Sequence, residues 1–125
     1  MVELAPGSTC TVSGITVNTW QADHSSGSPA LLLHLNLAGK TIAYTGDTAW
    51  TDALADAAAG ADLLIAEAYY RHKNIPYHLR HADLDAHRDR LAARRIILTH
   101  MSADVLNHPD EVSFEIAHDE LVITV

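Results

Sequence analysis

Tyr44-Thr45-Gly46-Asp47-Thr48 and Ile97-Leu98-Thr99-His100-Met101-Ser102 are the two stretches that decide the fold class of this chain. Each contains a short β-favouring run that ends at a side chain able to bind a metal ion, Asp47 in the first stretch and His100 in the second. An open α/β sheet presents a functional site by placing such side chains at the carboxyl ends of its strands. The pair therefore predicts an α/β fold with two metal ligands at one edge of a sheet.

The rest of the chain predicts alternating strands and helices. A hairpin with the tight turn Ala38-Gly39-Lys40 is expected, and Gly60 is expected to close a short Ala-rich helix. The expected strands are 15–20, 31–37, 41–45, 62–66, 95–99 and 121–125, and the expected helices are 52–59 and 83–93. Hairpin strands followed by strand-helix-strand units indicate a mixed sheet with helices on one face, formed as a single domain by residues 1–125.

Composition excludes several classes of function. The chain has 125 residues, 48% of them hydrophobic, and a formal net charge of −8, so it offers no broad basic surface for nucleic acid. The single Cys10 rules out an internal disulfide and a cysteine-rich zinc site, and it fits a cytoplasmic protein. No stretch reads as a signal peptide or a membrane span.

Polar side chains end three consecutive predicted strands, which is a stronger signal than any one of them alone. They are Asp47, Glu67 and His100. We expect them to meet at one edge of the sheet, where carboxylate and imidazole groups could bind metal.

The remaining histidines are interpreted less specifically. His34 and His87 are expected to be packed or surface residues, and His108 and His118 are expected to be solvated.

Four matches give the chain a resemblance to a known family. They are Asp23-His24-Ser25, the Gly46-Asp47-Thr48 segment, the strand 61–68 that ends Ala66-Glu67-Ala68, and Thr99-His100. Together they resemble the carboxyl-terminal half of a metallo-β-lactamase-fold hydrolase, closest to the tRNase Z-like subgroup. The resemblance implies half of an αββα four-layer sandwich.

The resemblance also implies roles for individual residues. It makes His24, Asp47 and His100 metal ligands in a site for two divalent ions, with zinc expected and manganese or iron as alternatives. Glu67 would orient His78, which fits its place in the family better than His72 or His81 does, and His78 would donate a proton to the leaving oxygen. The implied reaction is hydrolysis of phosphodiester or related ester bonds by a metal-bound hydroxide, with lactam hydrolysis as the alternative.

Two departures from the family pattern limit what this chain does alone. Ala66-Glu67-Ala68-Tyr69 stands where tRNase Z has His-Glu-Ala-Thr, and the family's His-x-His-x-Asp-His motif is absent. Zinc binding by the isolated chain should therefore be weak or absent, and the chain alone inactive.

Three accounts of the chain remain open. It is a fragment of a longer hydrolase, one subunit of a split enzyme whose partner supplies the amino-terminal half, or a non-catalytic module with a vestigial metal site that binds a partner or forms a homodimer through its exposed sheet. The substrate in the first two accounts is a small molecule or a phosphodiester.

Overall fold

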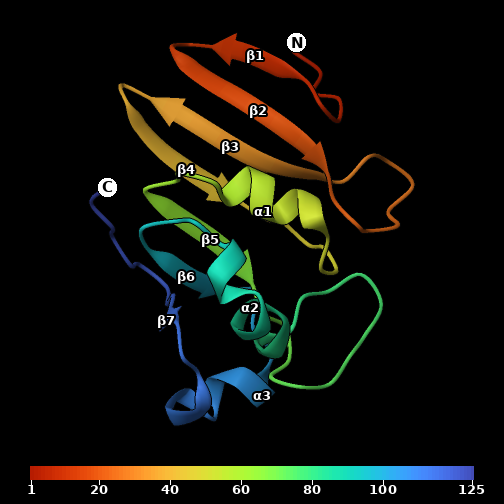
Figure 1. Cartoon of the computed structure of the whole chain (residues 1–125), viewed down its shortest axis with the longest axis vertical. Helices are drawn as coiled ribbons and strands as arrows, with labels where there is room; N and C mark the ends of the chain where they lie inside the picture. Colours follow the sequence, from red (N-terminus) through yellow and green to blue (C-terminus); the bar gives the residue numbers. More distant parts are fainter.

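The computed structural model describes all 125 residues as one seven-stranded sheet with three short α-helices (Figure 1). The strands are β1 (Thr9–Val12), β2 (Ile15–Gln21), β3 (Leu31–Leu37), β4 (Lys40–Tyr44), β5 (Leu63–Glu67), β6 (Ile96–Thr99) and β7 (Glu115–Ile116). The α-helices are α1 (Asp52–Ala58), α2 (His81–Ala86) and α3 (Ala103–Leu106), and two 3-10 turns cover Arg88–Arg90 and Pro109–Glu111. The expected mixed sheet of an α/β fold is confirmed.

The type of strand pairing changes once across the sheet. The pairs from β1 to β4 are antiparallel, and the pairs from β4 to β7 are parallel. In the parallel part, Tyr44 pairs with Ile65 and Glu67 pairs with Thr99. The carboxyl ends of β4, β5 and β6 therefore lie at the same edge of the sheet, as the sequence predicts.

Left-handed backbone conformations explain two of the chain reversals. Ala38 and Gly39 join β3 to β4 with φ angles of 52° and 78°, as in the two-residue turns that match the twist of a hairpin. Gly60 follows α1 with a φ of 72°, a conformation that costs glycine little. Both turns lie where the sequence predicts them.

The two faces of the sheet differ in what covers them. Figure 1 shows α1 and α2 in front of the sheet, where Leu32, Ala43 and Leu98 join the buried cluster that also contains Leu54 of α1. Because side chains alternate along a strand, the residues next to these point to the opposite face. That face, called here the open face, carries the half-buried side chains Leu33, Leu35, Ile42 and Ile65 and the more exposed Tyr44.

The second helix differs from the prediction. It begins at His81 and ends at Ala86, and a separate 3-10 turn follows, whereas the sequence predicts one helix from Asp83 to about Ala93. Asp83 is the third helical residue, and its carboxylate accepts a hydrogen bond from the Arg80 backbone N–H at 3.0 Å. A side chain that accepts from the backbone N–H of the cap residue belongs to the residue three positions after the cap, and the cap here is Arg80. The helix therefore begins earlier than the sequence predicts.

The prediction of a last strand at residues 121–125 is wrong. These residues form no strand and Val122 is 88% exposed, although their alternation of β-branched residues favours an extended conformation. Strand formation also needs a free partner, and β7 occupies the edge of β6 instead, through the pairs Ile97–Glu115 and Leu98–Ile116. Strand β1 and helix α3 were not predicted.

The helices are too short and too polar to cross a membrane. A spanning helix needs about 20 apolar residues, and no helix here has that length and hydropathy.

Candidate metal centre

Four side chains converge beyond the carboxyl ends of the parallel strands. Asp47 follows β4, Glu67 ends β5, His100 follows β6, and His78 comes from the loop between β5 and α2. Each offers one donor atom, and these four atoms lie within 4.8 Å of one another. The three strand-end residues predicted to meet therefore do meet, and the predicted partner His78 joins them.

Glu67 lies at the centre of this cluster and is 1% exposed. Its Oε2 accepts the backbone N–H groups of Thr48 at 3.1 Å and Leu79 at 3.2 Å. Its Oε1 contacts Nδ1 of His78, and Nδ1 of His100 lies 3.0 Å away. A carboxylate costs much free energy to bury unless it is paired and hydrogen-bonded, and four partners meet that condition here. Glu67 thus fixes the positions of both imidazole rings.

Asp47 and His100 form the accessible side of the cluster. Nδ1 of His100 lies 3.0 Å from Oδ1 of Asp47, and both side chains are 44% exposed. His100 has a φ of 49°, a backbone conformation uncommon outside glycine that is found at functional sites.

The donor atoms fit a divalent metal. Zinc binds nitrogen and carboxylate oxygen at about 2.0–2.2 Å, so two ligands of one ion lie about 3 Å apart. Imidazole with carboxylate also suits manganese and iron. Asp47 and His100 are the most exposed residues of this cluster, whereas His78 is 21% exposed and contacts Glu67, and Glu67 is enclosed by its own hydrogen bonds.

His24, the third predicted ligand, lies beside the cluster rather than among its four converging donors. Its ring centroid is 5.6 Å from that of His78 and 5.8 Å from that of Tyr77. The adjacent Asp23 donates its backbone N–H to Oγ1 of Thr48 at 2.9 Å, which ties this segment to the residue after Asp47.

His81 is separate from the centre. It is buried, and its Nε2 accepts the backbone N–H of Ser113 at 3.0 Å. Burial lowers the pKa of His81, while the nearby Asp85 carboxylate acts in the opposite direction. His78 rather than His81 is therefore the histidine that reaches Glu67.

Four other histidines lie outside the cluster. His34 contacts the carbonyl of Ala57 in α1, and His87 stacks on Trp50 with centroids 3.8 Å apart. His108 and His118 are exposed. All four positions agree with the structural interpretations made from the sequence.

An ion-pair network holds the loop that carries His78 against α3. The Arg71 backbone N–H donates to Oδ2 of Asp104 at 2.9 Å, and its guanidinium binds Oδ1 of Asp104 and Glu111. The hydrogen bond from Arg71 lowers the pKa of the Asp104 carboxyl. The Ser102 N–H also donates to the Tyr69 carbonyl at 2.9 Å, so the two segments flanking the centre are joined directly.

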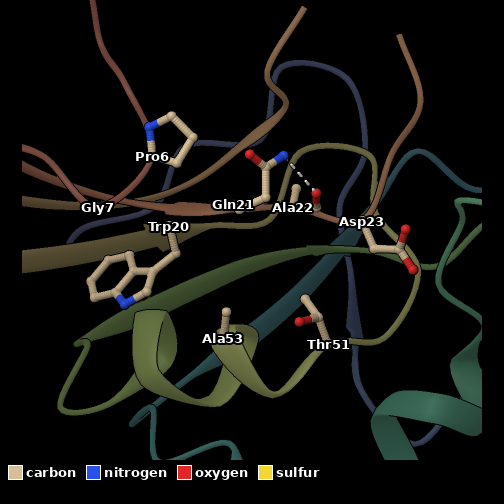
Figure 2. Close-up of a pocket in the computed structure, with 8 residues that line it drawn as sticks. All are labelled: Pro6, Gly7, Trp20, Gln21, Ala22, Asp23, Thr51 and Ala53. Atoms are coloured by element: carbon tan, nitrogen blue, oxygen red, sulfur yellow. Dashed lines mark hydrogen bonds between the residues drawn. The ribbon is translucent and has the colours of Figure 1, made fainter.

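The largest cavity does not contain the cluster. It has a volume of about 580 Å³ and lies between the N-terminal segment, the end of β2 and α1 (Figure 2). Its lining residues are Pro6, Gly7, Trp20, Gln21, Ala22, Asp23, Thr51 and Ala53. The cluster is bordered instead by a second cavity of about 480 Å³, which His100 lines.

Sequence reasoning missed several residues that shape the centre. Thr48 and Leu79 donate backbone hydrogen bonds to Glu67, and Thr45 accepts the Glu67 N–H on its hydroxyl at 3.0 Å. No local pattern in the sequence marks these contacts, because they join segments that meet only in the folded sheet. Of these three residues, Thr48 is the one that the sequence could have indicated, because it directly follows the predicted ligand Asp47.

Comparisons with known proteins identify the family and the fold. Residues 1–101 match the family model described as a β-lactamase superfamily domain. No curated protein matches the chain.

Three solved structures share the fold. A diphosphatase from the PhnP family is 23% identical with a TM-score of 0.74, covering 94% of this chain and 46% of its own. The human short-form tRNase Z is 21% identical with a TM-score of 0.69, covering 92% and 45%. Zinc-bound PqqB from Methylobacterium extorquens is 15% identical with a TM-score of 0.67, covering 98% and 55%. The chain thus spans about half the length of the structures it matches.

Proposed function

Since the chain belongs to the β-lactamase superfamily, we propose that it supplies the carboxyl-terminal half of a metal-dependent hydrolase for phosphodiester or related ester bonds. The observation that carries the proposal is the buried Glu67, which holds His78 and His100 beside the exposed Asp47. The tRNase Z and the PhnP-family diphosphatase among the structural neighbours support phosphorus esters as the substrate class.

Each side chain of the centre has a role in the proposal. Asp47 and His100 hold a divalent ion, which we take to be zinc, with His24 as a further ligand from the loop after β2. A bound divalent metal lowers the pKa of water and polarises a phosphoryl oxygen. Glu67 accepts from Nδ1 of His78, so the other ring nitrogen of His78 is free to give a proton to the leaving oxygen.

The proposal makes the centre incomplete in this chain. A catalytic zinc site uses three protein ligands and an open position, and Asp47 and His100 are the two most exposed of the converging side chains, while His78 is paired with Glu67. The chain covers 46% of the diphosphatase and 45% of the tRNase Z, so the proposal assigns the remaining ligands to an amino-terminal half in the same protein or in a partner.

The test measures zinc content and hydrolysis of bis(p-nitrophenyl) phosphate. We expect far less than one zinc per isolated chain and little turnover. A complex with the amino-terminal half that carries His-x-His-x-Asp-His should hold about two zinc ions and turn over. Near-stoichiometric zinc in the isolated chain would contradict the incomplete centre, and an inactive complex would contradict the hydrolase.

Matched variants of the complex separate the role of His78 from that of the loop around it. His78→Asn should lower kcat by about 10²–10⁴-fold with zinc content unchanged, as for loss of a general acid. His72→Asn changes an exposed histidine of the same loop and should leave kcat unchanged. Equal kcat values for the two variants would rule out proton transfer by His78.

A further inference from the structure

The cavity beside His100 is the part of the centre that no catalytic role explains. Its volume is about 480 Å³, which lies within the range of small-molecule sites. Thr99, His100 and Met101 line it at the end of β6, and Ala117 lines it just after β7. Because β6 and β7 are parallel, the cavity opens at the same edge of the sheet as the cluster.

The lining of this cavity combines three apolar side chains with four polar ones. Met101, Leu106 and Ala117 contribute apolar surface, and Leu106 at the end of α3 is 51% exposed. Asp119 brings a carboxylate, and His118 lies beside it with Nδ1 2.8 Å from the Asp119 carbonyl oxygen. A second anionic group of a substrate would be repelled there, whereas an uncharged apolar group would bury surface against Leu106 and Met101.

The charge of the whole chain points the same way. The net charge of −8 disfavours a polyanion such as RNA at this edge, where Asp47 and Asp119 are both exposed. A small ester with one reacting group and one uncharged apolar arm avoids repulsion by these carboxylates and still buries apolar surface in the cavity.

We propose that the cavity lined by Met101, Leu106 and Ala117 binds an uncharged aryl or branched alkyl arm of the substrate, so that the substrate class is small esters with an apolar substituent. This inference rests on the proposed hydrolase function for the reacting group. The apolar arm occupies the cavity while the ester lies against His100, which the cavity and the cluster share.

The binding test uses Met101 as a probe inside the cavity. The chain has two methionines, Met1 and Met101, so the ε-methyl NMR signal of Met101 is readily assigned. Titration of the full chain with benzyl alcohol, a neutral aromatic probe, should give a saturable ring-current shift of this signal. The same titration with methanol should give none.

Two leucine variants make the binding test specific. Leu106→Asn should weaken benzyl alcohol binding at least about fivefold, because it removes apolar surface from the cavity wall. Leu37→Asn replaces a leucine with nearly the same exposure, 53%, that lines a different cavity, and it should bind as the unchanged chain does. No saturable shift, or equal binding by the two variants, would overturn the inference.

This readout is independent of hydrolysis and of metal. If the complete protein failed to hydrolyse bis(p-nitrophenyl) phosphate while the Met101 shift and its loss in Leu106→Asn were observed, the proposed hydrolase would fail and the apolar cavity would stand. If hydrolysis were observed without the shift, the cavity assignment alone would fail.

Discussion

At the scale of single residues, His78 and His81 lie only three positions apart in the sequence but have different surroundings. His78 is 21% exposed and contacts Glu67, whereas His81 is 6% exposed and accepts from Ser113. The family resemblance, through the place of its histidine relative to His100, predicts which of them reaches Glu67. The sequence cannot predict the partner of His81, because Ser113 lies 32 residues away.

The lowered pKa of His81 predicts acid sensitivity of the fold. The unfolded chain takes up a proton at His81 as the pH falls below about 6.5, while the folded chain resists it because the pKa of buried His81 is depressed. Stability contributed by neutral His81 is therefore complete above pH 6.5. Below that pH the folding equilibrium should fall by up to about tenfold per pH unit, until the folded pKa is reached.

Urea unfolding at pH 7.5 and pH 5.5 measures this effect. His81→Gln keeps an acceptor for the Ser113 N–H but does not titrate, so its loss of stability over this interval should be smaller than that of the unchanged chain. Asp83 and Asp85 have pKa values lowered from 3.8, so their effects fall at lower pH. Equal losses for the variant and the unchanged chain would exclude His81 as the source.

At the scale of elements, strands and turns are predicted better than helices and sheet edges. Strand β3 has the predicted bounds, because Leu31–Leu37 is a leucine-rich run that ends at a hairpin turn. Helix α2 is half its predicted length, and β7 replaces the predicted last strand. Where a helix ends and which segment forms an edge strand depend on contacts with residues far away in the sequence. A single sequence does not show those contacts.

Helix α1 tests how the covered face of the sheet is held. Leu54 is 1% exposed and lies in the buried cluster with Leu32 and Ala43. Leu54→Ala should lower the free energy of unfolding by about 2–5 kcal/mol, because it leaves a cavity under the helix. Leu37→Ala, at a position 53% exposed, should lower it by less than about 1 kcal/mol. Similar losses in urea unfolding would mean that α1 is not packed as described.

At the scale of the whole molecule, the open face is the side of the sheet that the helices leave uncovered. Leu33, Leu35, Ile42 and Ile65 form an apolar surface without a helix on it. We propose that an amino-terminal half covers this face, and that a second copy of the chain covers it when that half is absent.

Sedimentation velocity tests the open face. The isolated chain should associate as its concentration rises, and Leu33→Lys should shift it toward monomer by placing a charge on that face. Val122→Lys adds the same charge at a residue 88% exposed and should leave association unchanged. A monodisperse monomer of the unchanged chain at all concentrations would show that the open face needs no cover.

The strand-end residues of the candidate centre were predicted correctly, because parallel strands place their carboxyl ends at the same edge of the sheet. Asp47, Glu67 and His100 needed only the order of strands, and His78 needed the family resemblance. The cavity beside His100 was not predicted, because it forms between α3, the end of β6 and the segment after β7.

The order of the strands in the sheet has a consequence for how the chain assembles. Each strand lies next to the one that precedes it in sequence, from β1 to β7. A chain emerging from the ribosome can therefore add every new strand to an edge already in place, and no strand is left unpaired until a much later one is synthesised. The cost of closing each connecting loop stays small, since it grows with loop length. The candidate metal centre is an exception, because its four donor atoms come together only after His100, which follows β6, has been synthesised.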